Sequence, residues 1–213
     1  MNTIKIKNIN GEVIYTRVSE NATIKDVVEE AVKNGVSLCD ADLYYADLEG
    51  ANLKGADLYG VLLEGAYLTN ADLTNADLRY SVIDLADLRN ANLEDTNLEG
   101  SSFDNACLEG VNLHKANLEG ADLNGTNLNK ANITGANLKG AYLRSANLKD
   151  TNLCNANLEG AYLRRANLND ANLTGANLTD ANLQETVLRN ANLTVANLAG
   201  ANLHYADIEN IKK

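Results

Sequence analysis

The chain has 213 residues and a formal net charge of −11, with no Pro, no Trp, one Phe and one Met. This acidity argues against a nonspecific nucleic-acid binder, which needs a basic face, and no run approaches the ~20 apolar residues that span a bilayer. No charged-then-apolar leader precedes residue 30, so the sequence predicts a cytoplasmic protein without a membrane segment.

Residues 1–35 are predicted to form an N-terminal capping motif, a hairpin followed by a helix. Two short apolar runs, Ile4–Ile6 and Val13–Tyr15, are the predicted strands. Asn10 and Gly11 lie between them, and an Asn-Gly pair is a strong signal for a tight hairpin turn. The hairpin is therefore expected to be antiparallel.

A helix is predicted to follow the hairpin. Thr23 is a suitable N-cap, with Asp26 three residues later in a weaker form of the capping box, and Gly35 ends the helix. The apolar residues with the spacing of one helical face are Ile24, Val27, Val28, Ala31 and Val32. We interpret this stripe as a cover for the open end of the structure that follows; a separate partner-binding helix is the alternative.

A five-residue repeat begins after the helix. A large apolar residue stands at every fifth position from Leu38 to Ile208, and 31 of these 35 residues are Leu. Two places before each stands a small residue, Ala in 26 cases, and the residue between them is usually Asn or Asp. The unit is A-(N/D)-L-x-x, and we name its places the small, second, central, fourth and corner positions. We assign residues 36–210 to the repeat domain and residues 211–213 to a short basic tail.

A period of five fits neither regular secondary structure. On an α-helix, steps of about 100° per residue would spread the central residues around the whole circumference. On a strand, an odd period would send successive central residues to opposite faces. Only a chain that turns a corner in every unit keeps all of them on the inside.

The corner positions carry the residues that such turns require. Of the 35 corner residues, 13 are Gly, seven are Asn and five are Asp. These residue types tolerate a positive φ, which the third position of a type II turn demands. Twenty-five of the 35 corners are therefore compatible with a left-handed residue.

The repeat resembles the pentapeptide-repeat family over about four-fifths of the chain. In that family four units form one square coil, so the resemblance implies an all-β solenoid, a right-handed quadrilateral β-helix of about nine coils. At ~4.8 Å between coils the rod would be about 40 Å long. A coil of 20 residues agrees with the bulky second-position pairs Leu62 and Val82, and Tyr142 and Tyr162, each 20 residues apart.

The two ends of the repeat domain differ. Only five residues follow Ile208, too few for a covering helix, and an open coil edge presents unpaired backbone groups that favour association. We therefore predict an end-to-end homodimer through the last coil, as in family members that dimerise this way. The expected contact residues are Leu203, Tyr205, Ile208 and Ile211.

No catalytic, metal or cofactor site is predicted. The two histidines, His114 and His204, are 90 residues apart and would lie on different faces of a 20-residue coil. The three cysteines, Cys39, Cys107 and Cys154, also fall on different faces, too distant for a disulfide. A side-chain hydrogen-bond ladder is the interpretation of the column Asn92, Asn112, Asn132, Asn152, Asn172 and Asn192.

Charge is distributed unevenly along the repeat. Residues 36–125 carry 17 acids and four bases, a net of −13, whereas residues 126–213 carry seven acids and nine bases, a net of +2. On the face whose central residues include Leu43 and Leu63, acidic and basic residues would stack in one column, with tyrosines beside it. The candidate partner-binding residues are Glu64, Asp84, Asp104, Tyr142, Arg144, Tyr162, Arg164 and Arg165. The alternative is that solvated charges only keep the rod in solution.

The leading hypothesis for function is a noncatalytic, rigid interaction scaffold for an unidentified protein partner, with no direct contact to nucleic acid or membrane. A second hypothesis is an acidic DNA mimic that binds a DNA-binding enzyme, because some proteins of the resembled family modulate DNA gyrase. Two departures separate this chain from several gyrase-protecting relatives: it has no loop insertions between coils, and its central residues are almost all Leu rather than Phe. A purely structural, self-associating rod is the third hypothesis, and enzymatic activity is the least favoured.

Overall fold

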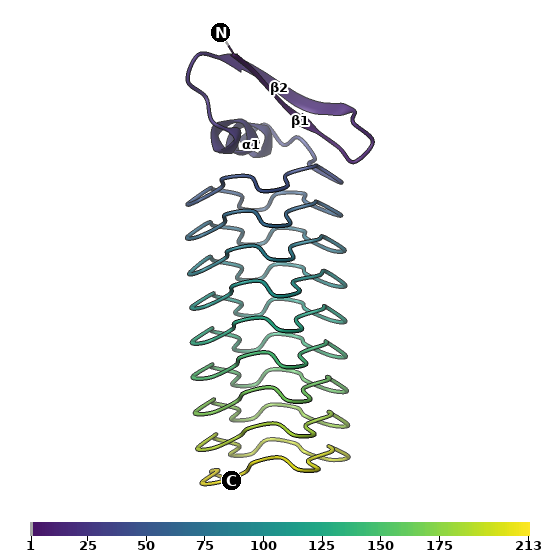
Figure 1. Cartoon of the computed structure of the whole chain (residues 1–213), viewed down its shortest axis with the longest axis vertical. Helices are drawn as coiled ribbons and strands as arrows, with labels where there is room; N and C mark the ends of the chain where they lie inside the picture. The colour runs from purple at the N-terminus through teal and green to yellow at the C-terminus, as the bar shows by residue number, and fades with distance from the viewer. Residues whose placement is uncertain (1) are drawn as a thin grey trace.

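The structure, a computed structural model, describes residues 2–213. Strand β1 (Asn2–Lys7) pairs antiparallel with strand β2 (Val13–Ser19), and helix α1 (Ile24–Lys33) follows. The rest of the chain winds into a straight stack of coils, with the hairpin and α1 at one end and the C-terminus at the other (Figure 1).

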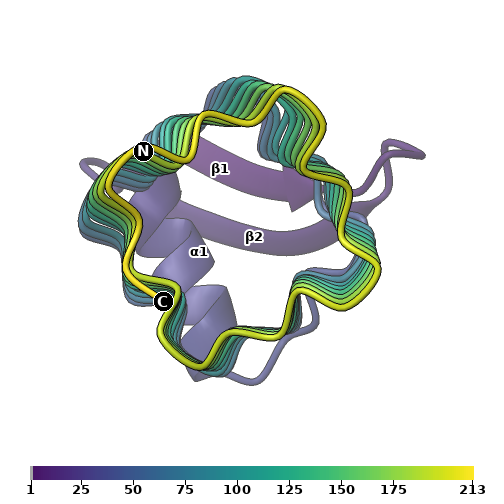
Figure 2. The ribbon, with the colours of Figure 1, turned by 90° about the horizontal axis from the view of Figure 1, so that it is seen from below.

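Each coil contains 20 residues and has four sides. Second-position residues form parallel bridges with the residue 20 places later, as between Leu62 and Val82. Figure 2, a view along the stack, shows the square outline and the near superposition of successive coils. We name the four faces A, B, C and D after the first central residue on each, which are Leu38, Leu43, Leu48 and Leu53 respectively.

Three backbone hydrogen bonds per unit join each coil to the next. On face B, for example, the N–H of Leu43 donates to Leu62 O (2.9 Å), the N–H of Leu62 donates to Ala41 O (2.9 Å), and the N–H of Tyr45 donates to Glu64 O (3.0 Å). Almost every backbone group that points along the rod is paired in this way. The side chains point either into the interior or outward from the four faces.

The central residues fill the interior, as the period of five predicts. From Leu38 to Leu188 every central side chain is at most 3% exposed, and the small residues pack beside them. Where a small position is Ser or Thr, the buried hydroxyl donates to a backbone carbonyl, as Ser81 Oγ does to Leu78 O (2.6 Å). These polar residues therefore enter the core without leaving a buried donor unpaired.

All 35 corner residues have a positive φ, between 53° and 71°. The N–H that follows the corner closes the turn, as Ala41 N does on Leu38 O (3.1 Å), and both features are those of a type II turn. The expectation from residue type was too cautious, because ten corners occupied by other residues adopt the same conformation. The inter-coil hydrogen bonds impose the conformation there against its local cost.

Glycine is required at a corner where a side chain from the preceding coil covers it. The ring of Tyr80 lies over Gly100, where an added Cβ would lie 2.7 Å from Tyr80 Cε1. Tyr45 covers Gly65 in the same way. A large corner residue and a glycine 20 residues later thus form a pair across two coils.

Leu85→Gly is expected to give a protein about 1 kcal/mol more stable than Leu85→Ala. Leu85 is a corner residue with φ of 59° and a side chain 59% exposed. Both substitutions remove the same exposed side chain, but only glycine relieves the left-handed strain. Urea unfolding of the two variants measures the difference, and an alanine variant as stable as the glycine variant would show that the corner is unstrained.

Helix α1 has a complete N-terminal capping box. Thr23 Oγ1 accepts from Asp26 N (3.2 Å), and the Asp26 carboxylate accepts from Thr23 N (2.7 Å). The second bond heads the interactions that lower the pKa of Asp26. At the other end, Val36 N donates to Ala31 O (3.0 Å) and Gly35 has φ of 69°, so the helix stops on a left-handed glycine.

The N-terminal elements lie across the first coil (Figure 2). Val27, Val28 and Ala31 of α1 and Ile6 of β1 are 0–1% exposed and belong to the same apolar cluster as the central leucines. Polar contacts add to this packing: Lys25 Nζ donates to Glu49 O (2.7 Å). The first coil is therefore covered by apolar side chains and by hydrogen-bond partners.

Further contacts satisfy backbone groups of the first coil that have no coil above them. Asp42 N donates to Lys7 O (2.8 Å), and Ile9 N donates to Asp40 O (2.9 Å). Asn52 N donates to Glu29 Oε1 (2.7 Å). The hairpin and the helix thus supply hydrogen bonds that a preceding coil would otherwise make.

The C-terminal edge has a different environment. The N–H groups of Leu198, Leu203 and Ile208, which point along the rod, donate no hydrogen bond within residues 2–213. Tyr205 is 77% exposed and Ile208 is 49% exposed. Within residues 2–213, the last coil therefore contains both unpaired N–H donors and exposed apolar side chains.

Candidate interaction face

Asparagine ladders line three of the four faces. On face A the side-chain amides of Asn117, Asn137, Asn157 and Asn177 each donate to the Oδ1 of the asparagine one coil earlier, at 3.0–3.1 Å. A shorter ladder on face C links Asn127, Asn147 and Asn167. These amides satisfy one another and fix the outward surface of each face in a periodic, structural role.

The ladder predicted on face D forms in part. Asn112 and Asn132 donate to the preceding asparagine at 2.8 and 2.9 Å, and Asn172 donates to Asn152 at 3.2 Å. Asn192 instead donates to Thr174 Oγ1 (2.9 Å), whose hydroxyl donates to Asn172. A fourth-position threonine therefore relays the ladder. The longer ladder of face A was not predicted, although the same column of asparagines is visible in the sequence.

Face B has no asparagine ladder in the part of the chain that the structure describes. Its second-position column is Asp42, Leu62, Val82, Ser102, Asp122, Tyr142, Tyr162, Asn182 and Asn202. Tyr142 and Tyr162 are 46% and 47% exposed, and their rings stack with centroids 5.0 Å apart and an interplanar angle of 6°. Face B thus replaces amides with aliphatic and aromatic side chains on its outer surface.

The fourth-position column of face B carries a charge gradient. Backbone bonds such as Gly65 N to Asp84 O (2.9 Å) and Gly125 N to Arg144 O (3.0 Å) place the predicted residues on successive coils. The column is Tyr44, Glu64, Asp84, Asp104, Asn124, Arg144, Arg164, Gln184 and His204. It changes from acidic to basic at Asn124, and its three carboxylates are in no ion pair among the described residues.

Local hydrogen bonds offset the repulsion between the stacked acids. Asp84 Oδ1 accepts from Asp104 N (2.8 Å) and from the hydroxyl of Ser102. Asn105 Nδ2 donates to Asp104 Oδ2 (3.0 Å). Since donors to a carboxylate stabilise its charged form, the acidic column can persist without a cation from the same chain.

The basic end is partly neutralised by a residue that the sequence analysis missed. Glu185 accepts from Arg164 Nη2 (2.6 Å) and from Arg165 Nε (2.6 Å). Hydrogen bonds from Arg165 and then Arg164 lower the pKa of Glu185. The signal was present, because Glu185 follows Arg165 by one coil in the same corner column. Of the predicted arginines, Arg144 is in no ion pair within residues 2–213.

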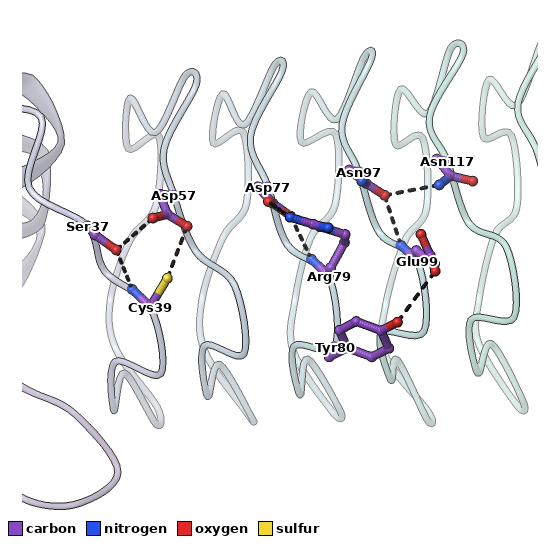
Figure 3. A network of polar contacts seen from close by, with 9 residues as sticks. All are labelled: Ser37, Cys39, Asp57, Asp77, Arg79, Tyr80, Asn97, Glu99 and Asn117. Carbon is purple, nitrogen blue, oxygen red and sulfur yellow. Dashed lines mark hydrogen bonds and ion pairs between the residues drawn. The ribbon is translucent and has the colours of Figure 1, made fainter.

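Arginines of the acidic half outside face B are bound to their own units. Arg79 on face A donates to Asp77 through Nε (2.8 Å) and Nη2 (2.6 Å), as Figure 3 shows. Arg89 on face C binds Asp87 in the same two-point manner. These pairs neutralise two acids on faces A and C. Glu94 on face D and Glu99 on face A, like the three acids of face B, are in no ion pair among the described residues.

A polar network on face A surrounds Cys39 (Figure 3). The thiol donates to Asp57 Oδ1 (3.2 Å), and Ser37 Oγ donates to Asp57 Oδ2 (2.6 Å). Burial raises the pKa of the Cys39 thiol, and the neighbouring Asp57 carboxylate adds to this increase. Because the thiolate is the reactive form, this environment slows attack by the thiol.

Asp57→Asn is expected to increase the alkylation rate of Cys39 near neutral pH by about two- to tenfold. The substitution removes a carboxylate that raises the pKa of the thiol, and later coils of face A already accommodate asparagine at this position. Peptide mapping after timed iodoacetamide treatment measures the rate, with Cys154 on face D as the internal control. An unchanged Cys39 rate would show that Asp57 does not govern the thiol.

The remaining candidate reactive groups lie apart. His114 is on face D, whereas His204 is on face B beside Tyr205, with ring centroids 3.8 Å apart. Residues 2–213 contain no cluster of three or more His, Cys, Asp or Glu side chains that could hold a metal ion. Within the same residues, no helix has the length and apolar character needed to cross a membrane.

A groove of about 570 Å³ lies between α1 and the first coil, lined by residues that include Glu29, Lys33 and Lys54.

Comparisons with known proteins agree with this architecture. The family model for pentapeptide repeats matches eight copies over residues 34–58, 56–95, 83–120, 112–150, 141–180 and 176–212. HetL, a pentapeptide repeat protein involved in heterocyst differentiation regulation from the cyanobacterium Nostoc sp. strain PCC 7120, is 38% identical. That alignment covers 80% of this chain and 82% of HetL, with a TM-score of 0.35.

A more distant similarity links the chain to QnrB1, a plasmid-mediated fluoroquinolone resistance protein. A trypsin-treated variant of QnrB1 is 18% identical, with 78% of this chain and 86% of QnrB1 covered and a TM-score of 0.52. No curated protein gives a significant sequence match. From the repeat, the square coils and these matches, the chain belongs to the pentapeptide-repeat family and folds as a right-handed quadrilateral β-helix.

Proposed function

We propose that this protein is a noncatalytic, rigid scaffold that binds a protein partner through face B. The observation that carries the proposal is the outer surface of face B: asparagine ladders run along parts of faces A, C and D, whereas face B combines an acidic column, two aliphatic side chains and two stacked tyrosines. Exposed aromatic and arginine side chains are typical of residues that contribute most to protein interfaces.

The rigidity of the rod supports this role. Inter-coil hydrogen bonds fix each outer side chain relative to its neighbours, so a partner loses little affinity to ordering of this surface. The chemistry of the acidic half favours a basic partner, because Glu64, Asp84 and Asp104 have no cation from this chain. HetL, the 38% identical relative, is described as involved in a regulatory process, for which a binding role is suitable.

Affinity capture with charge-neutral variants tests the scaffold. The triple variant Glu64→Gln, Asp84→Asn, Asp104→Asn removes the acidic column of face B, and Asp72→Asn, Glu94→Gln, Asp95→Asn is the matched control on the opposite face D. A specific partner should be retained by the wild type and the face D variant and lost, by at least tenfold in affinity, with the face B variant. Equal retention by all three proteins would show that face B is not the binding surface.

A DNA mimic that binds DNA gyrase is the second candidate function. It is supported by the net charge of −13 in residues 36–125, because an acidic rod about as wide as a duplex can occupy a basic DNA groove. A gyrase supercoiling assay at micromolar concentrations tests it with the wild type and the face B triple variant. No effect of the wild type would remove this candidate, and equal inhibition by both proteins would exclude face B from it.

End-to-end self-association through the last coil is the structural alternative. The unpaired N–H groups of the C-terminal edge and the exposed Tyr205 and Ile208 support it, together with partly buried Leu203 and Ile211. An edge-to-edge contact would pair these groups as a further coil does. Light scattering over a dilution series tests the contact, and a monomer at tens of micromolar would rule it out.

A further inference from the structure

Face B is self-complementary about one point. Its second-position column contains two aliphatic residues, Leu62 and Val82, and two tyrosines, Tyr142 and Tyr162. Successive members of this column are one coil apart. Leu62 and Tyr162 therefore lie equally far from the midpoint between Ser102 and Asp122, on opposite sides. Val82 and Tyr142 are also equidistant from that midpoint.

The charged column has the same centre. Glu64 and Arg164 lie equally far from the midpoint between Asp104 and Asn124, and so do Asp84 and Arg144. In both cases the two equidistant residues carry opposite charges. The second-position column and the fourth-position column of face B therefore have the same centre, and about it each column pairs residues of complementary chemistry.

We propose that two copies of this chain associate antiparallel, face B to face B, about a twofold axis between the coils of Ser102 and Asp122. The axis lies in the plane of contact and is perpendicular to the rods, so the two rods run in opposite directions. Each outer column of face B then faces the same column of the other copy. Such an isologous contact requires a self-complementary surface. The contact uses the same face as the proposed partner, so the dimer and that partner would compete for face B, but the inference is tested on the chain alone.

In this arrangement the four apolar residues of the second-position column pair with one another. Leu62 and Val82 would pack on Tyr162 and Tyr142 of the second copy, which places the half-exposed rings against aliphatic side chains. Each such contact occurs twice because of the symmetry. The apolar residues would then be covered without any contact to the asparagine ladders of the other faces.

The charged groups are available for these contacts. Arg144 has no ion-pair partner within the described chain, and Asp84 uses only Oδ1 for its internal bonds. Arg164 donates to Glu185 through Nε and Nη2, and a guanidinium with five N–H groups retains donors for Glu64 of the second copy.

The centre of the contact contains no pair of like charges. Ser102 would face Asp122 of the second copy, and Asp104 would face Asn124, so no carboxylate meets another carboxylate. The Nδ2 group of Asn124 can donate to Asp104, whereas the Ser102 hydroxyl already donates to Asp84. At the edge of the face, the 53% exposed ring of Tyr80 would lie opposite Gly140, which has no side chain to obstruct it. A register shifted by one coil toward the C-terminus would place Asp122 against Asp122, so the present register is favoured.

The expected association is weak. The complementary residues extend over five coil steps, about 24 Å, and a contact of this length on one narrow face buries less than the ~1,200 Å² of a standard interface. We therefore expect a dissociation constant on the order of 10–100 µM. Sedimentation equilibrium of the full chain from about 5 to about 500 µM covers this range.

Charge reversal tests the pairing. Asp84→Arg and Arg144→Asp should each weaken the dimer by at least tenfold, because each replaces an attraction by a repulsion at two symmetric places. The double variant Asp84→Arg, Arg144→Asp should recover a dissociation constant within about threefold of the wild type. Glu94→Arg, in the same coil on the opposite face D, is the control and should leave the dimer unchanged.

Mixing the two single variants gives the sharpest result. In a heterodimer of the Asp84→Arg and Arg144→Asp chains, both reversed sites meet the opposite charge, so the equimolar mixture should dimerise although neither variant does alone. Wild type that stays monomeric over the whole range overturns the proposal. So does a dimer that resists both single reversals, which would point to the C-terminal edge instead. Tyr142→Asn, which introduces the residue of the ladder faces, should weaken the dimer while thermal unfolding shows a folded chain.

Discussion

Phe103→Ala is expected to lower the free energy of unfolding by about 3–5 kcal/mol. Phe103 is a central residue of face B, is 0% exposed, and is the largest fully buried side chain of the protein among the described residues. Its coil is held on both sides, by the bonds from Phe103 N to Asp122 O (2.7 Å) and from Ser102 N to Ser81 O (2.9 Å). The walls therefore cannot close around the cavity that alanine leaves.

Phe103→Leu is the control for this prediction. It introduces the residue that occupies most other central positions, and we expect a loss of no more than about 1.5 kcal/mol. Urea unfolding followed by far-ultraviolet circular dichroism measures both variants. Equal stability of the alanine and leucine variants would show that the interior is not closely packed at this coil.

Val28→Asp is expected to release the N-terminal elements from the rod. Val28 lies on α1, is 0% exposed, and packs in the same apolar cluster as the leucines of the first coil. Burial of a carboxylate without a partner costs several kcal/mol of free energy. We expect this cost to exceed the free energy that holds the ten-residue helix α1 against the first coil. The first coil would then lose both its apolar cover and the bonds from Lys25 and Glu29.

The measurements for this variant are limited proteolysis within residues 1–35 and binding of a hydrophobic dye. Both should rise sharply, while the coils retain most of their circular dichroism signal because each coil is stabilised mainly by its neighbours. Val18→Asp, at a β2 side chain that is 60% exposed, is the matched control and should change neither. A Val28→Asp protein as resistant to protease as wild type would contradict the proposed protective role of the N-terminal elements.

The pattern of apolar residues was sufficient to predict the interior. A period of five is incompatible with a straight helix or strand, so the central residues had to converge, and their burial from Leu38 to Leu188 confirms this. The corners were predicted less completely. Residue type identifies a left-handed position where Gly, Asn or Asp stands there, but Leu85 and Val195 adopt the same φ because neighbouring coils hold them.

The sequence places the residues of face B in columns, but it does not give the contacts between their side chains. Adding 20 to a residue number is enough to place Glu64, Asp84 and Asp104 in one column. It does not show that Asp84 receives the N–H of Asp104, or that Glu185 neutralises Arg164. Such contacts depend on side-chain rotamers and on differences of a few tenths of an ångström in the distance between two atoms. A repeat pattern specifies neither.

The sequence alone determined which residues point inward, that each unit turns a corner, and which columns form on the outer walls, because all three follow from a strict period. The tertiary structure decided which outer groups remain unpaired. Side chains on neighbouring coils lie close enough to compete for the same donors and acceptors. Asparagine amides therefore bond to one another along faces A, C and D, and Glu185 pairs with two arginines at the basic end of face B. The charges that remain outside any ion pair within residues 2–213, on face B and also at Glu94 and Glu99, can be identified only from the spatial arrangement of the side chains.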